Sequence, residues 1–226
     1  MKKLFCLMVA GLMSAALAAE APKYDHPDSS KWADVFRADL SDATCNKEVW
    51  KFEDGVLSAN KDEAIWTKAE WENYTLDLEF RNDKATNSGV VVYCTNIGNW
   101  IPNSVELQIL DDYADKWKTV APNWKCASAF GHQPPVEQTV KPAGEWNRMT
   151  ITCRGKIITI ALNGKLVNTI DMDKFTDAKK NPDGSDVPAW LSNPMAKMAT
   201  KGFVGFQGKH GDALIYFRNL KIKSLD

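Results

Sequence analysis

A strict alternation of apolar and polar residues over positions 74–81 is the feature that most constrains what this chain can fold into. Successive side chains of a β-strand point to opposite faces, so the alternation predicts a strand that buries one face in a core. The predicted core face carries Tyr74, Leu76, Leu78 and Phe80, and the other face carries Thr75, Asp77, Glu79 and Arg81. A second alternation follows at 105–109, where Glu106 and Gln108 face away from the apolar side chains.

Further β-rich segments lie along the rest of the chain. Residues 149–162 are rich in Ile and Thr and lead into Asn163-Gly164, which between such runs is the strongest short signal for a hairpin. Strands are also predicted at 89–93, 202–208 and 214–223. Helical periodicity is scarce, and we expect only a short helix within 188–200 and one turn within 171–180.

Many short strands with long loops predict a single β-sandwich domain over residues 31–226. Residues 19–30 are polar, contain two prolines, and are predicted to form a flexible entry segment. The long stretch 112–142 has no clear strand, and long ordered loops in compact domains are often functional. We expect a polar groove on the outer face that carries Arg81, Glu106 and Gln108.

The first 18 residues have the pattern of a secretory signal peptide. Lys2 and Lys3 precede an uncharged apolar run, and Ala16-Leu17-Ala18 supplies the small residues of a cleavage site. A membrane anchor is the alternative reading, but a spanning helix needs about 20 apolar residues. We therefore expect an exported protein, periplasmic or secreted, with no membrane span.

The charge balance argues against a nucleic-acid partner. The chain has 28 basic and 29 acidic residues, for a net charge of −1, and removal of the leader would take away two lysines and no acid. Nucleic-acid-binding surfaces usually carry a basic excess, so a phosphate-binding face is not expected.

Four cysteines lie beyond the leader, at Cys45, Cys94, Cys126 and Cys153. In an exported chain they suggest up to two disulfides, with buried free thiols as the alternative. No C-x-x-C pair occurs, so a zinc site of that type is not predicted.

Three residues are candidates for proton transfer. His132 lies in a loop fixed by two prolines and a glycine, and His210 lies in a glycine-flanked turn. Imidazole suits acid–base work near neutral pH, although a lone surface histidine is more often only solvated. Glu106 is the carboxylate candidate, with a solvated sheet face as the alternative. It has no convincing second carboxylate of the kind that an ordinary glycosidase needs.

Nine tryptophans make a sugar-binding face a natural expectation, because a flat ring can stack on a pyranose. Trp100, Trp117 and Trp124 are the candidates, and packing is the alternative for each. Other site classes are not predicted: the chain has no phosphate-binding glycine loop and no nucleophile elbow, and the acids within 171–186 lack calcium-loop spacing.

Eight motifs, in order along the chain, resemble those of the 3-keto-disaccharide hydrolase domain family. They are WKFEDGVL (50–57), YTLDLEFR (74–81), NSGV (87–90), ELQILD (106–111), GEWN (144–147), LNG (162–164), GFQGKHG (205–211) and FRNLKIK (217–223). The resemblance implies an all-β, concanavalin-like jelly-roll sandwich with long loops. It also implies an exported enzyme that acts on glycosides already oxidised at sugar carbon 3.

That activity has a simple chemical basis. A ketone at C3 acidifies the hydrogen at C2, and its removal by a base gives an enolate. The group at C1 then leaves by β-elimination with help from a general acid, and water adds to the resulting enone. The route needs one base, one acid and one donor to the enolate oxygen, without the paired carboxylates of an ordinary glycosidase.

On this hypothesis Glu106, His132 and His210 carry the proton transfers, in an order that the sequence leaves open. The candidates for substrate binding are Arg81, Gln108, Asp111, Trp124, Gln207, Lys209 and Arg218. The alternative interpretation of Asp111 is that it starts a turn. No cofactor is predicted, but the three proton-transfer residues could ligate a divalent metal if they converge. A non-catalytic sugar-binding module and an ordinary glycoside hydrolase remain the rival functions.

Overall fold

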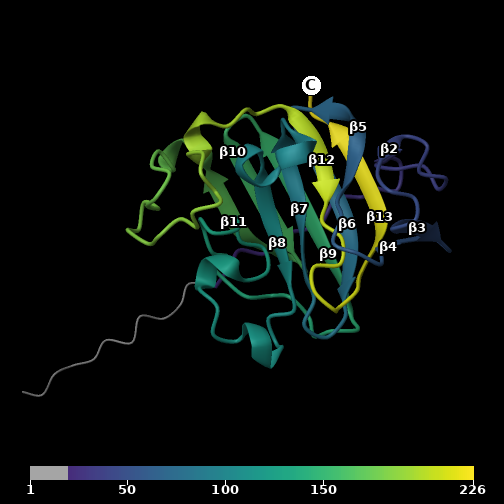
Figure 1. Cartoon of the computed structure of the whole chain (residues 1–226), viewed down its shortest axis with the longest axis horizontal. Helices are drawn as coiled ribbons and strands as arrows, with labels where there is room; N and C mark the ends of the chain where they lie inside the picture. Colours follow the sequence, from purple (N-terminus) through teal and green to yellow (C-terminus); the bar gives the residue numbers. More distant parts are fainter. Residues whose placement is uncertain (1–19) are drawn as a thin grey trace, which may run out of the picture.

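A computed structural model describes residues 20–226 and contains two antiparallel sheets packed face to face (Figure 1). The predicted all-β, concanavalin-like jelly-roll sandwich is therefore confirmed. Neighbouring strands in each sheet are mostly distant in sequence, which is how a jelly roll joins its strands across two sheets. The predicted signal peptide lies outside the described residues.

The larger sheet has eight strands and the smaller sheet has five. The larger sheet consists, in spatial order, of β11 (Lys165–Asp171), β10 (Ile157–Leu162), β9 (Trp146–Arg154), β6 (Tyr74–Asn82), β13 (Ile215–Ser224), β4 (Val56–Ala59) and β3 (Trp50–Glu53), with β1 (Ala33–Asp34) also paired to β13. The smaller sheet consists of β2 (Ala43–Thr44), β5 (Ile65–Trp71), β12 (Gly202–Phe206), β7 (Asn87–Cys94) and β8 (Val105–Leu110).

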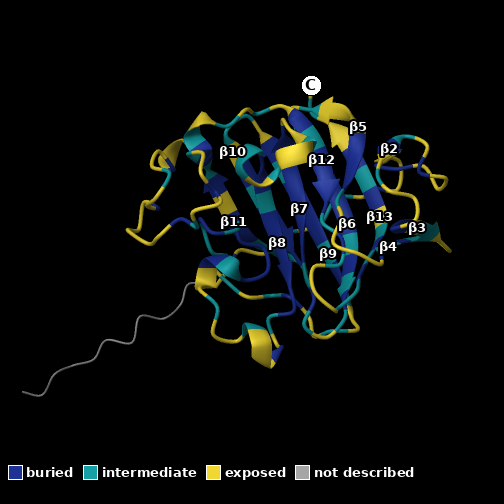
Figure 2. Ribbon diagram, in the orientation of Figure 1, coloured by how far each residue is buried: buried dark blue, intermediate teal, exposed yellow. Residues whose placement is uncertain are grey.

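The inner faces of the two sheets form the main core. Leu76, Leu78 and Phe80 of β6 are fully buried, as are Leu107 and Ile109 of β8. Figure 2 shows that buried residues concentrate on the strands while exposed residues concentrate in the connecting loops. The two alternations in the sequence therefore identify the core faces correctly, because burial of apolar area is the main force that holds two sheets together.

The Asn163-Gly164 hairpin is confirmed as the connection between β10 and β11. Both residues have positive φ, 50° and 84°, as a two-residue type I′ turn requires. The Ile- and Thr-rich run before it contains most of β9 and all of β10, with a turn at Gly155, whose φ is 51°. A glycine adopts this left-handed conformation without steric cost, so the chain reverses direction there.

The predicted helices are wrong in type, because residues 20–226 contain 3-10 turns and no α-helix. The turns are η1 (Ile97–Asn99), η2 (Ile101–Asn103), η3 (Asp115–Trp117), η4 (Pro122–Trp124), η5 (Met172–Lys174) and η6 (Met195–Lys197). Short 3-10 turns are a common way to connect strands. The five strands before β6 were not predicted. Strands β1 and β2 have only two residues each and β5 lacks a strict alternation, whereas β3 and β4 form a hairpin at Asp54-Gly55 whose local signal the sequence analysis did not use.

Residues 21–29, which we call the N-terminal strap, are held to the larger sheet rather than left as the flexible entry segment expected for 19–30. Ala21 is buried in the core, and the Tyr24 amide donates to the Gly164 carbonyl at 2.8 Å. Asp77 of β6 points away from the core but is buried, because the strap covers it and Ser29 donates a hydrogen bond to it at 2.5 Å. Backbone pairing and side-chain bonds together anchor the strap.

All four cysteines beyond the leader are free, so the alternative of free thiols holds and the predicted disulfides do not form. Cys94, Cys126 and Cys153 are buried and Cys45 is half-buried. Free cysteine is a small apolar residue that packs well in cores. Separately, no helix within residues 20–226 is long and apolar enough to cross a membrane.

Candidate active site

A pocket of about 320 Å³ lies on the outer face of the smaller sheet, where β8, β7 and β12 run side by side. Its lining residues are Asn87, Trp100, Ile101, Glu106, Gln108, Trp124, Phe130, Trp190, Gln207 and His210. Glu106 and Gln108 come from the polar face of β8, as the alternation predicts. Strands supply the floor and loops supply the walls, so Asn87, Glu106 and Gln108 rest on rigid strands whereas His210 stands on a loop.

The side chain of Glu106 lies over Gly89 of the neighbouring strand β7. A Cβ atom at that glycine would stand 2.4 Å from Glu106 Oε1, so only glycine leaves room for the carboxyl group. Burial, and to a smaller extent the nearby charge of Asp62, together raise the pKa of Glu106 to about 8. Glu106 is therefore mostly protonated at neutral pH and able to donate a proton.

His210 is paired with Asp62, a residue that the sequence analysis did not single out. The two side chains come from different loops, β12–β13 and β4–β5, and His210 Nδ1 lies 2.5 Å from Asp62 Oδ2. The loops are in close contact, because a Cβ at Gly208 would lie 2.5 Å from the Lys61 carbonyl oxygen. A carboxylate on Nδ1 fixes the imidazole and leaves Nε2 available to accept a proton.

Two amide side chains from adjacent strands form a fixed pair on the pocket floor. Gln108 is only 2% exposed, and its Nε2 donates to Asn87 Oδ1 at 3.1 Å. Gln207, at the end of β12, points its Nε2 toward Asp62 Oδ1 at 3.5 Å. Asn87 belongs to the NSGV motif but was not itself predicted as a site residue.

Aromatic rings form the walls of the pocket. Trp124 packs against Phe130 and against Trp190, with ring centroids 5.0 and 6.1 Å apart. Trp100 stands on Trp66, 6.1 Å away, above the smaller sheet. Trp100 and Trp124 are thus in the pocket as predicted, and the half-exposed Trp190 joins them from the β11–β12 connection.

His132 does not line this pocket. It is buried, its Nδ1 lies 3.0 Å from Asn181 Oδ1, and its ring packs edge-on against Phe175. Burial lowers the pKa of His132, partly offset by the bond to Asn181, so the ring is neutral at pH 7. It lines a separate small pocket with Lys174 and Pro182. The structure therefore brings Glu106 and His210 together without His132.

Arg81 and Arg218 lie on the outer face of the larger sheet, so Arg81 does not share a face with Glu106 as expected. Arg81 stacks 4.4 Å from the ring of Tyr216, and Arg218 stacks 4.0 Å from that of Trp146. The Arg218 side chain also donates to Glu79 at 2.6 Å. The alternation could not reveal this, because it assigns a residue to a face of its own strand and not to a sheet.

The remaining candidates have other positions. Asp111 is buried and accepts hydrogen bonds from the backbone amides of Ala85 and Tyr113, so it has the turn role given as its alternative. Lys209 is next to His210, and its amide donates to the Lys61 carbonyl at 2.9 Å, but its side chain is not among the pocket lining. Trp117 donates from its indole to a backbone carbonyl and packs on the core.

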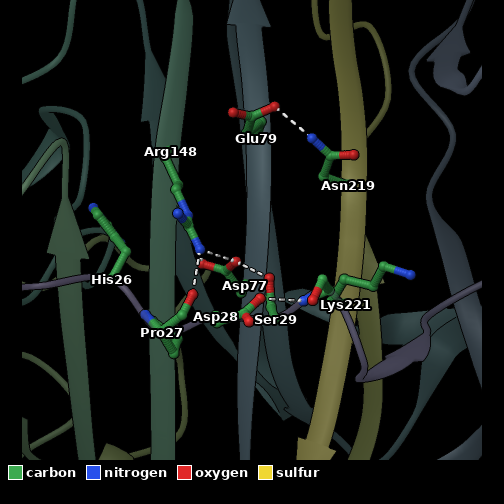
Figure 3. Close-up of a pocket in the computed structure, with 10 residues that line it drawn as sticks. His26, Pro27, Asp28, Ser29, Asp77, Glu79, Arg148, Asn219 and Lys221 are labelled. Carbon is green, nitrogen blue, oxygen red and sulfur yellow. Dashed lines mark hydrogen bonds and ion pairs between the residues drawn. The ribbon is translucent and has the colours of Figure 1, made fainter.

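A larger pocket of about 560 Å³ lies on the opposite face of the molecule, between the N-terminal strap and the larger sheet. Figure 3 shows Arg148 and Ser29 converging on Asp77 there, while Asn219 reaches Glu79. Arg148 donates to Asp77 at 2.8 Å and to the Pro27 carbonyl at 2.6 Å. These groups satisfy one another and fasten the strap, so we place the chemistry in the smaller pocket.

The three proposed metal ligands do not converge, since His132 is absent from the pocket of Glu106 and His210. Within residues 20–226, no group of three or more His, Cys, Asp or Glu side chains is placed to hold a metal ion. The pocket instead offers a protonated carboxyl group, an imidazole oriented by a carboxylate, and amide donors. Such a set can move protons at neutral pH.

Comparison with known proteins agrees with the motif-based resemblance. The model of the 3-keto-alpha-glucoside-1,2-lyase-like domain matches residues 25–223, which is nearly all of the chain. A curated relative from Bacteroides thetaiotaomicron, named 3-keto-disaccharide hydrolase, is 27% identical over 175 residues. The match covers 69% of this chain and 60% of the relative, so the chain spans about 60% of that protein's length.

Solved structures give the same picture. A crystal structure from Parabacteroides distasonis, provisionally assigned as a glycosyl hydrolase, is 56% identical with a TM-score of 0.84. The match covers 86% of this chain and all of that one. A second such structure from the same organism is 21% identical, with a TM-score of 0.65 and coverage of 83% and 90%, and supports the fold alone.

Proposed function

The chain belongs to the family of 3-keto-alpha-glucoside-1,2-lyase-like domains, and on this basis we propose that it is an exported enzyme that cleaves 3-keto-glycosides. Family membership and the glycosyl-hydrolase relatives support a carbohydrate substrate. The observation that carries the proposal is the pairing of a protonated Glu106 with an Asp62-oriented His210 in one aromatic-walled pocket. Such a pair suits proton removal at C2 followed by departure of the group at C1.

His210 acts as the base in this proposal. Its Nδ1 is hydrogen-bonded to Asp62, so Nε2 receives the proton from C2 while the C–H electron pair forms the enolate. The imidazolium that results is stabilised by the adjacent carboxylate of Asp62, as in other carboxylate–histidine pairs. The C3 ketone is what makes this proton acidic enough to remove.

Glu106 acts as the acid. When the enolate collapses, its electrons re-form the C3 carbonyl and expel the oxygen at C1, which takes the proton of Glu106. Water then adds to C1 of the enone, giving its proton to the Glu106 carboxylate, and His210 returns a proton to C2. Both side chains end in their starting states, and the net reaction is hydrolysis.

The walls suit a neutral sugar. Trp100, Trp124 and Trp190 present flat apolar surfaces, and stacking on such rings suits the C–H faces of a pyranose. Amide side chains on the floor offer partners for its hydroxyl groups. The predicted leader at 1–18 would place this activity in the periplasm or outside the cell.

Replacing Glu106 by Gln tests its role through the leaving group. An alkyl or sugar alcohol needs a proton to leave, so Glu106→Gln should lower its release from a 3-keto-glucoside by about 10²–10⁴-fold. Release of 4-nitrophenolate, which leaves without a proton, should fall less than about tenfold. His210→Asn should slow both substrates, because both need the base.

The assay includes the matching unoxidised glucosides and separates the rival functions. Wild-type release from the 3-keto substrates alone supports the proposal. Release from unoxidised glucosides would make the protein an ordinary glycosidase, and binding without release would make it a sugar-binding module. Equal loss of both leaving groups in Glu106→Gln would remove Glu106 from the acid role.

A further inference from the structure

We propose that the side-chain amide of Asn87 donates the hydrogen bond that stabilises the enolate oxygen, and that Gln108 holds this amide in the required orientation. The inference rests on the proposed function, because an enolate forms only if the C2 proton is removed. It assigns a catalytic role to a residue with no role so far, and a positioning role to its neighbour on β8.

The reaction requires a hydrogen-bond donor to the enolate oxygen, and few of the residues that line the pocket can be that donor. Removal of the C2 proton places negative charge on the oxygen at C3, and preorganised donors aimed at such charge are a major source of rate acceleration. None of the residues that line the pocket in the described chain is Lys or Arg. Of the cationic candidates from the sequence, Arg81 and Arg218 lie on the other sheet, and Lys209 is not among the residues that line the pocket. The donor must therefore be a neutral group.

Asn87 is the neutral donor whose direction is fixed. Because Gln108 Nε2 donates to Asn87 Oδ1, the Nδ2 group of Asn87 has to point away from Gln108. That NH₂ group makes no hydrogen bond to another described residue, and Asn87 lines the pocket. A free, oriented donor on a strand costs little reorganisation when the charge develops.

The other amide groups are committed elsewhere. Gln108 donates a hydrogen bond from its Nε2 to Asn87 and is nearly inaccessible to solvent, with 2% exposure. Gln207 directs its Nε2 toward Asp62, where it supports the carboxylate beside His210. Asn87 and Glu106 come from adjacent antiparallel strands, so donor and acid project from one rigid floor.

In this scheme each step of the elimination has one side chain that accepts a proton, donates a proton or stabilises the negative charge. The C2 proton goes to His210, the electron pair forms the C2–C3 double bond, and the negative O3 accepts a hydrogen bond from Asn87. When the pair returns to re-form the C3 carbonyl, the bond from C1 to the leaving oxygen breaks and Glu106 supplies its proton. No oxidant, reductant or additional reactant is required before water adds.

The experiment measures steady-state release from 4-nitrophenyl 3-keto-glucoside. Asn87→Ala should lower kcat about 10²–10³-fold with KM changed by less than about threefold, because the missing bond forms only with the developing charge. Asn87→Asp keeps an acceptor for Gln108 but replaces the donor with an anion, and should lose at least as much. Gln108→Leu should lower kcat about tenfold, because it frees the Asn87 amide to rotate.

Asn46→Asp is the matched control, since Asn46 is exposed, outside the pocket, and accepts the Glu48 amide as an aspartate also would. Melting curves verify folding, and Asn87→Asp decides the question if Asn87→Ala does not fold. A folded Asn87→Ala or Asn87→Asp within threefold of an active wild type would overturn the role of Asn87. Failure of the proposed function looks different, because the wild type itself would then release nothing.

Discussion

At the scale of single residues, the protonation of Glu106 depends on two neighbours, Gly89 and Asp62. Gly89 has no side chain where the carboxyl group lies, and Asp62 brings a negative charge near it rather than a positive one. The space at Gly89 lets the carboxyl group lie buried, and burial together with the charge of Asp62 keeps the proton on Glu106. A carboxyl group that is protonated at neutral pH can serve as an acid, as burial makes possible in other enzymes.

The raised pKa of Glu106, about 8, predicts the alkaline limb of the pH profile. The acid must be protonated to work, so kcat for a poor leaving group should fall tenfold per pH unit above about pH 8. A nitrophenyl substrate needs no acid, so its profile should lack this limb. A limb present for both substrates, or activity that instead rises through pH 8, would contradict the assignment.

The sequence identified part of this site for physical reasons. Alternation places Glu106 and Gln108 on one face, and a glycine-flanked turn marks His210 as exposed. Asp62 lies in a polar loop with no pattern that separates it from other surface acids. Its partner His210 lies 148 positions further along the chain, and only the fold reveals such a contact.

At the scale of elements, the N-terminal strap depends on a neutral histidine. His26 Nε2 accepts the Gly164 amide at 3.0 Å, and its Nδ1 lies 2.7 Å from Thr150 Oγ1, which itself donates to Asp77. The ring can satisfy both partners only with its proton on Nδ1. Protonation of Nε2 would place two N–H groups against each other.

The strap should therefore loosen in acid. Burial and the charge of Arg148 lower the pKa of His26 below its usual 6.5. A lowered folded pKa means that the contribution is fully present above pH 6.5 and is lost as pH falls through the folded value. Thermal melts of wild type and His26→Leu should differ by about 1 kcal/mol at pH 7.5 and converge toward pH 5.

His132 also has a pKa lowered by burial, so the wild type alone would show a mixed acid dependence. The difference between wild type and His26→Leu isolates His26, because His132 is common to both. A difference that stayed constant from pH 7.5 to pH 5 would show that the strap does not respond to this proton.

The elements themselves divide into those that a single sequence reveals and those that it does not. Strand β6 and the Asn163-Gly164 hairpin follow from local rules of side-chain direction and φ. The strap and strands β1, β2 and β5 follow from pairing with distant segments, such as β1 with the end of β13. Tertiary pairing of this kind leaves no periodic signal in the short segments.

At the scale of the whole molecule, the fold is stabilised without covalent cross-links. All four cysteines of the described chain are free, although the predicted leader would place the chain in a compartment where disulfides often form. The wide two-sheet core replaces them, because a domain of this size buries enough apolar surface to be stable without cross-links.

Reducing agents should leave the stability unchanged. Loss of one native disulfide typically costs about 2–5 kcal/mol, which in a domain of this size lowers Tm by several degrees. We expect the Tm with and without dithiothreitol to agree within about 1 °C. Thiol titration of the unfolded, unreduced chain lacking residues 1–18 should count four thiols, and a lower count would reveal a cross-link.

The division between the strand floor and the loop walls has a consequence for redesign. Trp100, Trp124 and Trp190 come from three connections, β7–β8, β8–β9 and β11–β12, whereas Glu106 and Asn87 stand on paired strands. The base His210 and its partner Asp62 stand on two other connections, β12–β13 and β4–β5, so the ring-bearing connections and the reacting groups occupy separate parts of the chain. Exchanging the three ring-bearing connections is therefore a route to new substrate preferences, with the catalytic floor and the two loops of Asp62 and His210 kept unchanged.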